Sequence, residues 1–129
     1  MKLYKVPSIL PEGKKDSEIK YFDNGNTVDV KYSCTDIEIM STHKYPFFAF
    51  VDIRKKLEKL NITVMCNACR IDVYPSGSST IGLMAYEMVI GLQATKLVNI
   101  FDVCDDLKLL ASIALQKDFR EKWLSSLQK

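Results

Sequence analysis

The first strong pattern along the chain is an alternation of apolar and polar residues, which is the period of a half-buried β-strand. The alternating apolar positions are Val28, Val30, Tyr32 and Cys34. Asn24-Gly25 lies just before them and suits a tight turn, so we predict a hairpin with Ile19–Phe22. The alternation shifts by one residue at Thr35-Asp36, which indicates a bulge or a turn. Met1–Asp16 contains prolines and lysines, and we expect this segment to be irregular or peripheral.

The period then changes to three and four residues, which predicts an amphipathic helix from Pro46 to Leu60. Proline suits the first turn of a helix because its missing N–H would have no partner there. The charged residues of this segment lie largely off the apolar stripe. The stripe is formed by Phe47, Phe50, Ile53, Leu57 and Leu60.

Short alternating segments follow this helix and predict further strands. The phase changes between Cys66 and Cys69, so Asn67-Ala68 is predicted to be a two-residue turn or a bulge. A helical C-terminus comes last, as one drifting helix or two consecutive helices, with Asp105-Asp106 near a helix N-terminus. The predicted strands are Ile62–Cys66, Cys69–Val73, Met84–Leu92 and Val98–Phe101. The predicted docking face of the terminal helix is Ala111, Leu115, Phe119, Trp123 and Leu127.

Together these segments predict an α+β fold in which a mainly antiparallel sheet is packed by a central amphipathic helix and a C-terminal helix. The chain has 129 residues, of which 47% are hydrophobic and 26% charged, and this suits one globular domain over residues 1–129. The net charge of +2 favours neither a nucleic-acid binder nor an acidic mimic of nucleic acid. Without a signal peptide or an apolar run of about 20 residues, we expect a cytoplasmic protein with no membrane partner.

The most conspicuous motif is Cys66-Asn67-Ala68-Cys69. A redox C-x-x-C pair needs a thiol at a helix N-terminus, whereas strand-like alternation surrounds both cysteines here. A zinc site would need Cys34 and Cys104 as well, and these two do not form a second pair at C-x-x-C spacing. We therefore interpret the cysteines as small buried hydrophobes at a turn, and expect no metal and no cofactor.

No set of catalytic residues is recognisable, so we expect a protein that is not an enzyme. His43 is the only histidine, and no cluster of metal-ligating or catalytic residues accompanies it. The loop Ser76–Thr80 lacks the Lys and the following helix of a phosphate-binding loop. The acidic residues Asp102, Asp105 and Asp106 lack the spacing of a calcium loop, although such a cluster also suits a basic partner surface.

Two segments, Cys66–Gly77 and Val98–Asp102, resemble small bacterial immunity proteins encoded beside polymorphic toxins, including those of contact-dependent growth inhibition. The resemblance covers about the middle third of the chain. It implies a cytoplasmic protein that binds one cognate toxin domain and blocks its active site.

We therefore interpret the chain as an immunity protein, with a small enzyme or a ligand-binding protein whose pocket lies between helix and sheet as the alternative. A structural subunit of a larger complex is a third reading. Tyr and Arg most often dominate binding energy at interfaces, and an acidic residue can set register. The predicted partner-binding residues are Arg70, Asp72, Tyr74 and Ser76. Alternatively, Arg70 and Asp72 simply form the solvated face of a strand.

Overall fold

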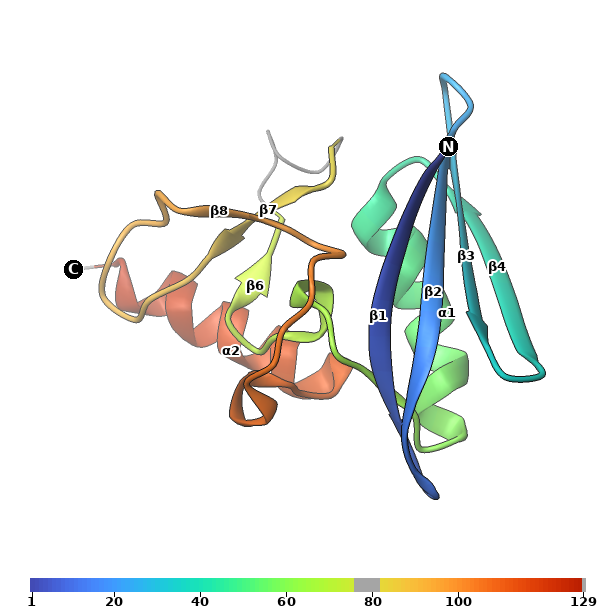
Figure 1. Cartoon of the computed structure of the whole chain (residues 1–129). Helices are drawn as coiled ribbons and strands as arrows, with labels where there is room; N and C mark the ends of the chain where they lie inside the picture. The colour runs from blue at the N-terminus through green and yellow to red at the C-terminus, as the bar shows by residue number, and fades with distance from the viewer. Residues whose placement is uncertain (76–81, 129) are drawn as a thin grey trace.

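The computed structural model describes residues 1–75 and 82–128. Within these residues the chain forms two antiparallel sheets and two α-helices, which confirms the predicted α+β class, with two sheets rather than one (Figure 1). Ser76, predicted to bind a partner, and the rest of the Ser76–Thr80 loop lie outside the described residues. The elements of the first part are β1 (Lys2–Leu10), β2 (Gly13–Asp23), β3 (Val28–Cys34), β4 (Ile37–His43), α1 (Pro46–Lys59) and β5 (Thr63–Val64). Those of the second part are η1 (Asn67–Cys69), β6 (Val73–Tyr74), β7 (Met84–Glu87), β8 (Leu97–Asn99), η2 (Leu107–Leu109) and α2 (Ile113–Ser126).

The larger sheet has the strand order β4-β3-β2-β1-β5 and includes the N-terminal segment. The prediction that Met1–Asp16 is irregular or peripheral is therefore wrong. β1 pairs with β2 from Lys2↔Tyr21 to Leu10↔Gly13, and also with β5. The apolar alternation of β1 is interrupted by Ser8, which is fully buried, and this polar residue on the inner face concealed the strand.

Both predicted turns in this sheet are confirmed. The connection between β2 and β3 contains Gly25 at a φ of 96°, a region that glycine adopts without steric cost. The N–H of Asn24 donates to the Thr27 carbonyl at 2.9 Å and closes this turn. The shift of alternation at Thr35-Asp36 is the turn between β3 and β4, where Thr35 has a φ of 52°.

The helix α1 covers the inner face of the larger sheet, as Figure 1 shows, and agrees with the predicted segment Pro46–Leu60. The predicted stripe is buried up to Leu57, whereas Leu60 caps the helix and is exposed. Tyr32 of β3 is buried on the same inner face, and its hydroxyl lies 2.7 Å from the Ser8 hydroxyl. The core therefore contains a polar group satisfied across three strands, because Ser8 is also 2.7 Å from Ser17 of β2.

The second part of the chain departs more from the predicted strands. The order of its sheet is β6-β7-β8, and each strand has four residues or fewer. The strand expected over Met84–Leu92 ends at Glu87, because Val89 and Leu92 bridge across a tight turn at Gly91. Asn67-Ala68, predicted to be a two-residue turn or a bulge, belongs to the 3₁₀ turn η1. The strand predicted over Cys69–Val73 is absent except for Val73, which begins β6.

The C-terminus contains two consecutive helical segments, which was one of the two predicted arrangements. Asp106 caps the short η2, since its carboxylate accepts from the Lys108 N–H at 3.0 Å, while Ser112 caps α2. The predicted docking face of the terminal helix is right only in part, since Leu115 is 54% exposed, whereas the other four residues of the row are half-buried. The buried residues of α2 are Ile113 and Gln116, and the polar character of Gln116 hid this face from a hydrophobic pattern.

Candidate functional site

The structure brings Arg70 and Asp72 together as an ion pair. The Arg70 guanidinium donates to both carboxylate oxygens of Asp72, at 2.9 and 2.8 Å, and to Glu87 of β7 at 2.9 Å. Burial raises the pKa of Glu87, but the hydrogen bond and charge of Arg70 outweigh it and hold the pKa below its usual value. The Arg70 guanidinium thus links the residues before β6 to β7, and few of its N–H donors remain for a partner.

Tyr74, the third predicted binding residue, is half-buried among aromatic and cationic side chains. Its ring centre lies 5.1 Å from that of Phe47 and 6.1 Å from that of Phe48, both in α1. The Arg120 guanidinium of α2 stands 4.8 Å from the ring centre on the other side. Tyr74 therefore joins the two helices to the small sheet, and its first role is structural.

All four cysteines are buried and free, as expected for small buried residues. Cys66 directly precedes the 3₁₀ turn η1 and Cys69 is its last residue, and the N–H of Cys69 donates to the Cys66 carbonyl at 3.0 Å. Among residues 1–75 and 82–128, no group of three or more potential metal ligands lies together. The expectation of no bound metal stays a prediction.

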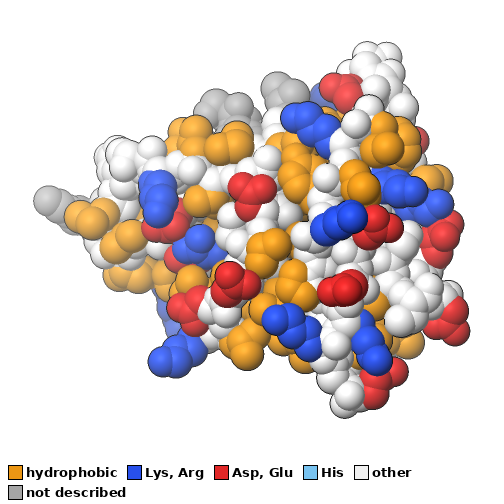
Figure 2. All heavy atoms as spheres, in the orientation of Figure 1, with side chains coloured by type: hydrophobic (Ala, Val, Ile, Leu, Met, Phe, Trp, Pro, Cys, Tyr) orange, Lys and Arg blue, Asp and Glu red, His pale blue; other side chains and the backbone are white. Residues whose placement is uncertain are grey.

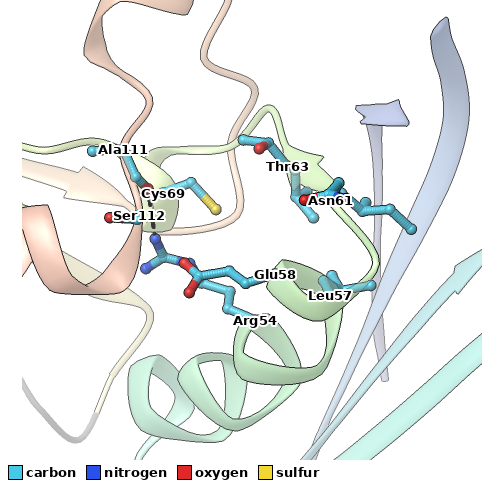
Figure 3. Close-up of a pocket in the computed structure, with 10 residues that line it drawn as sticks. Arg54, Leu57, Glu58, Asn61, Thr63, Cys69, Ala111 and Ser112 are labelled. Atoms are coloured by element: carbon cyan, nitrogen blue, oxygen red, sulfur yellow. Dashed lines mark hydrogen bonds between the residues drawn. The ribbon is translucent and has the colours of Figure 1, made fainter. Parts of the chain in front are cut away.

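A pocket of about 370 Å³ opens between the C-terminal half of α1, β5 and the residues that precede α2. Figure 3 shows the Cys69 thiol, the Arg54 guanidinium and the Glu58 carboxylate together on one side of this pocket. Leu57, Asn61 and Thr63 form the opposite side. The pocket therefore combines a thiol, a cation and a carboxylate opposite a wall of mixed polarity.

Arg54 is 4% exposed, and its guanidinium is held by neutral acceptors. It donates to the carbonyls of Ala68 and Ala111, at 3.0 and 2.9 Å, and to the Gln116 side-chain oxygen at 2.7 Å. Within the described part of the chain, no carboxylate forms an ion pair with it. Glu58 is engaged elsewhere, since its carboxylate accepts from the Ile113 N–H at 2.8 Å. A buried positive charge that forms no ion pair among the described residues thus lines the same pocket as Cys69, with the Glu58 carboxylate nearby.

The pKa values of the Cys66 and Cys69 thiols are shifted in opposite directions. The neighbouring Cys66 thiol lowers the pKa of Cys69 below its usual value, and although burial opposes this effect, the positive charge of Arg54 supports it. Burial raises the pKa of Cys66 well above its usual value. Cys69 is therefore the more acidic of the two thiols.

The sequence analysis missed Arg54, Glu58 and Gln116. One signal was present, because Arg54 is four residues after Phe50 and three before Leu57, on the buried stripe of α1. An arginine on such a stripe indicates either a buried network or a site. Gln116, three residues after Ile113, carries the same kind of signal in α2.

His43 is placed just before α1, where its Nδ1 accepts from the Tyr45 N–H at 3.1 Å. Its ring lies 5.9 Å from that of Phe48. His43 thus helps to shape the start of the helix, and it lines a different pocket from that of Arg54 and Cys69.

A second feature of the surface is the turn Val89–Leu92, between β7 and β8, which we call the apolar turn. Val89, Ile90 and Leu92 are 50%, 51% and 61% exposed. Figure 2 shows hydrophobic side chains gathered at the end of the molecule that holds this turn and the end of α2. The turn is fixed from α2, because the Gly91 N–H donates to the Ser126 hydroxyl and the Trp123 indole N–H donates to the Leu92 carbonyl, both at 2.8 Å.

No family model matches the chain, and no curated protein matches it at a significant level. Among the described residues, no helix has the length and apolar character needed to cross a membrane.

Proposed function

We propose that the chain is a cytoplasmic immunity protein, which binds a cognate bacterial toxin domain and neutralises it without catalysing a reaction. The observation that carries the proposal is the apolar turn. Exposed apolar residues that are concentrated in one place and held in one conformation are typical of protein-binding surfaces. A surface that is already ordered loses little entropy on binding, so more of its contact energy appears as affinity.

The partner we propose for this surface is a protein. Nucleic acid requires basic residues gathered on one face, whereas the whole chain has a net charge of +2. Around the apolar turn both signs occur, since Lys96 pairs with Glu87 at 3.5 Å. An apolar centre surrounded by charges of both signs is the usual anatomy of a protein–protein interface.

The segments that carry the resemblance to immunity proteins also belong to one structural unit. The N–H groups of Asn67 and Ala68 donate to the carbonyls of Asp102 and Ile100, at 3.0 and 2.7 Å. The described parts of Cys66–Gly77 and Val98–Asp102 are thus bonded together beneath the small sheet. This unit includes β6, and the small sheet to which β6 belongs carries the apolar turn. The apolar turn lies outside the two segments, but it follows β7, which pairs with β6 of this unit.

The test is co-expression with the toxin domain encoded by the neighbouring gene, in cells that the toxin stops growing. We expect the chain to restore growth and to co-purify with the toxin domain at a fixed ratio. A catalytically inactive toxin domain provides the control for binding without selection. Failure of the chain to bind the active and the inactive domain would contradict the proposal.

The alternative function, a small enzyme or ligand-binding protein, has one observation in its favour. The pocket at Arg54 and Cys69 lies between α1 and β5, which is the predicted position between helix and sheet. Turnover of a small molecule by the purified chain, abolished by Cys69→Ser, would favour this alternative over the immunity function.

A further inference from the structure

We propose that Cys66 and Cys69 form a dithiol–disulfide redox site, in which Cys69 reacts with a small hydroperoxide and Cys66 then closes an intramolecular disulfide. This site lies in the pocket described above and does not depend on the proposed toxin binding. Three features of the structure support it: the geometry of η1, the unpaired charge of Arg54 and the access to Cys69.

The geometry of η1 allows the two sulfurs to join. The hydrogen bond from the Cys69 N–H to the Cys66 carbonyl, at 3.0 Å, makes them the first and fourth residues of a turn. Such residues have Cα atoms less than about 7 Å apart, and a disulfide spans about 4.4–6.8 Å. A disulfide can therefore form within this turn without moving the strands around it.

The charge of Arg54 favours the reactive form of Cys69. A thiolate is the nucleophilic form of cysteine, and a neighbouring guanidinium stabilises it. Arg54 is buried with neutral hydrogen-bond acceptors, so a thiolate at Cys69 would face a positive charge that these acceptors do not neutralise. The group that opposes this is Glu58, whose charge raises the pKa of Cys69, but its effect is the smallest of those that act on this thiol. The thiolate and the guanidinium therefore stabilise each other.

Access distinguishes the two thiols. Cys69 lines the pocket, and Cys66 does not. Cys69 is only 2% exposed, which favours a small oxidant such as a hydroperoxide over a bulky disulfide. This arrangement makes Cys69 the attacking thiol and Cys66 the resolving one.

The reaction balances with one hydroperoxide for each dithiol. The Cys69 thiolate attacks the outer oxygen of the peroxide, the O–O bond breaks, and the leaving alkoxide or hydroxide takes up a proton, which leaves Cys69 as a sulfenic acid. The Cys66 sulfur then attacks the Cys69 sulfur. The S–O bond breaks, and the departing hydroxide takes the Cys66 proton and leaves as water. The dithiol is oxidised by two electrons. An alkyl hydroperoxide is reduced to an alcohol and water, and hydrogen peroxide is reduced to two molecules of water.

The experiment uses the full chain and hydrogen peroxide as the probe, with thiols blocked by iodoacetamide after denaturation. Before alkylation, we expect the intact mass to fall by the mass of two hydrogen atoms. After alkylation, Cys66 and Cys69 should be the two cysteines that remain unmodified. Cys34 and Cys104 provide matched controls, because both are buried and neither lines this pocket. At pH 7.5, we expect Cys69 to be oxidised before Cys34 and Cys104.

Two variants test the separate roles. In Cys66→Ser, oxidation should stop at the Cys69 sulfenic acid, which dimedone traps, whereas Cys69→Ser should form neither product. Cys34→Ser and Cys104→Ser should behave like the wild-type chain. If a variant fails to fold, mapping of the oxidised cysteines in the wild-type chain decides the question. Oxidation of Cys34 or Cys104 before Cys69, or no disulfide between Cys66 and Cys69, would overturn the proposal.

Discussion

Replacing Gln116 by leucine tests whether the buried network around Arg54 holds the two parts of the chain together. The Gln116 side-chain nitrogen lies 2.9, 2.8 and 2.9 Å from the carbonyl oxygens of Ala68, Arg70 and Val73. Its side-chain oxygen accepts from Arg54 at 2.7 Å. One residue of α2 thus satisfies polar groups from α1, η1 and β6, all of them far away in the sequence.

The size of the loss follows from the groups that remain without a partner. The Ala68 carbonyl still accepts from Arg54, and the Arg70 carbonyl still accepts from the Val73 N–H. Two losses are therefore the largest. The charged hydrogen bond from Arg54 to the Gln116 oxygen contributes about 1.5–3 kcal/mol, and the Val73 carbonyl that loses its Gln116 donor costs about 1–3 kcal/mol. We expect Gln116→Leu to lower the free energy of unfolding by about 3–5 kcal/mol, a large part of the 5–15 kcal/mol typical of a domain.

The assay is urea unfolding followed by the fluorescence of Trp123, the only tryptophan. Gln93→Leu is the matched control, because Gln93 is exposed, and its effect should stay within about 0.5 kcal/mol. The double variant Arg54→Met with Gln116→Leu should lose less than the sum of the two single variants, since they share a bond. A Gln116→Leu variant within about 1 kcal/mol of the wild type would refute the reasoning.

Two further predictions concern stability and can be checked with the same unfolding assay. Trp123→Phe keeps most of the packing but loses the hydrogen bond to Leu92, so we expect a loss of about 1 kcal/mol and faster proteolysis at the apolar turn. The full loss of a core tryptophan, about 3–5 kcal/mol, is not expected even for Trp123→Ala, because the residue is only half-buried. Burial raises the pKa of Tyr32 from 10.0 to about 12, so the stability that this phenol contributes is complete below pH 10 and lost as the pH rises toward 12. Tyr32→Phe should remove that alkaline decline, and an unchanged pH dependence of the unfolding free energy would contradict this.

Much of the first half of the fold could be predicted from the sequence. Within each of these segments the apolar side chains recur either at every second residue, as in a strand, or at every third and fourth, as in a helix. The alternation of β3, the Asn24-Gly25 turn and the stripe of α1 are local patterns, and all three are present in the structure. β1 was missed because Ser8 faces the core, where its hydroxyl is satisfied by Ser17 and Tyr32. A buried serine looks polar in the sequence, and its partners are on other strands.

The second half could not be predicted in the same way, since its short strands are held by long-range bonds. The alternation of Met84–Leu92 continues beyond β7 into the exposed apolar turn, so the pattern there reflects surface residues. The candidate site was missed for a related reason. Arg54, Cys69 and Gln116 are far apart in the sequence, and only the packing of α2 against α1 brings them together. Arg70 and Asp72 were selected as free surface residues, although they form an ion pair with each other.

Binding of the toxin domain by the apolar turn is tested most directly by the Kd of that complex for two matched variants. Leu92→Asp places a charge on the apolar turn, while Met40→Asp places one on the outer face of β4, where Met40 is 59% exposed. We expect Leu92→Asp to raise the Kd at least about 30-fold, a loss of about 2 kcal/mol or more as for an interface hot spot, and to abolish growth rescue. Met40→Asp should bind and rescue as the wild-type chain does. Equal Kd values for Leu92→Asp and the wild type would contradict the account.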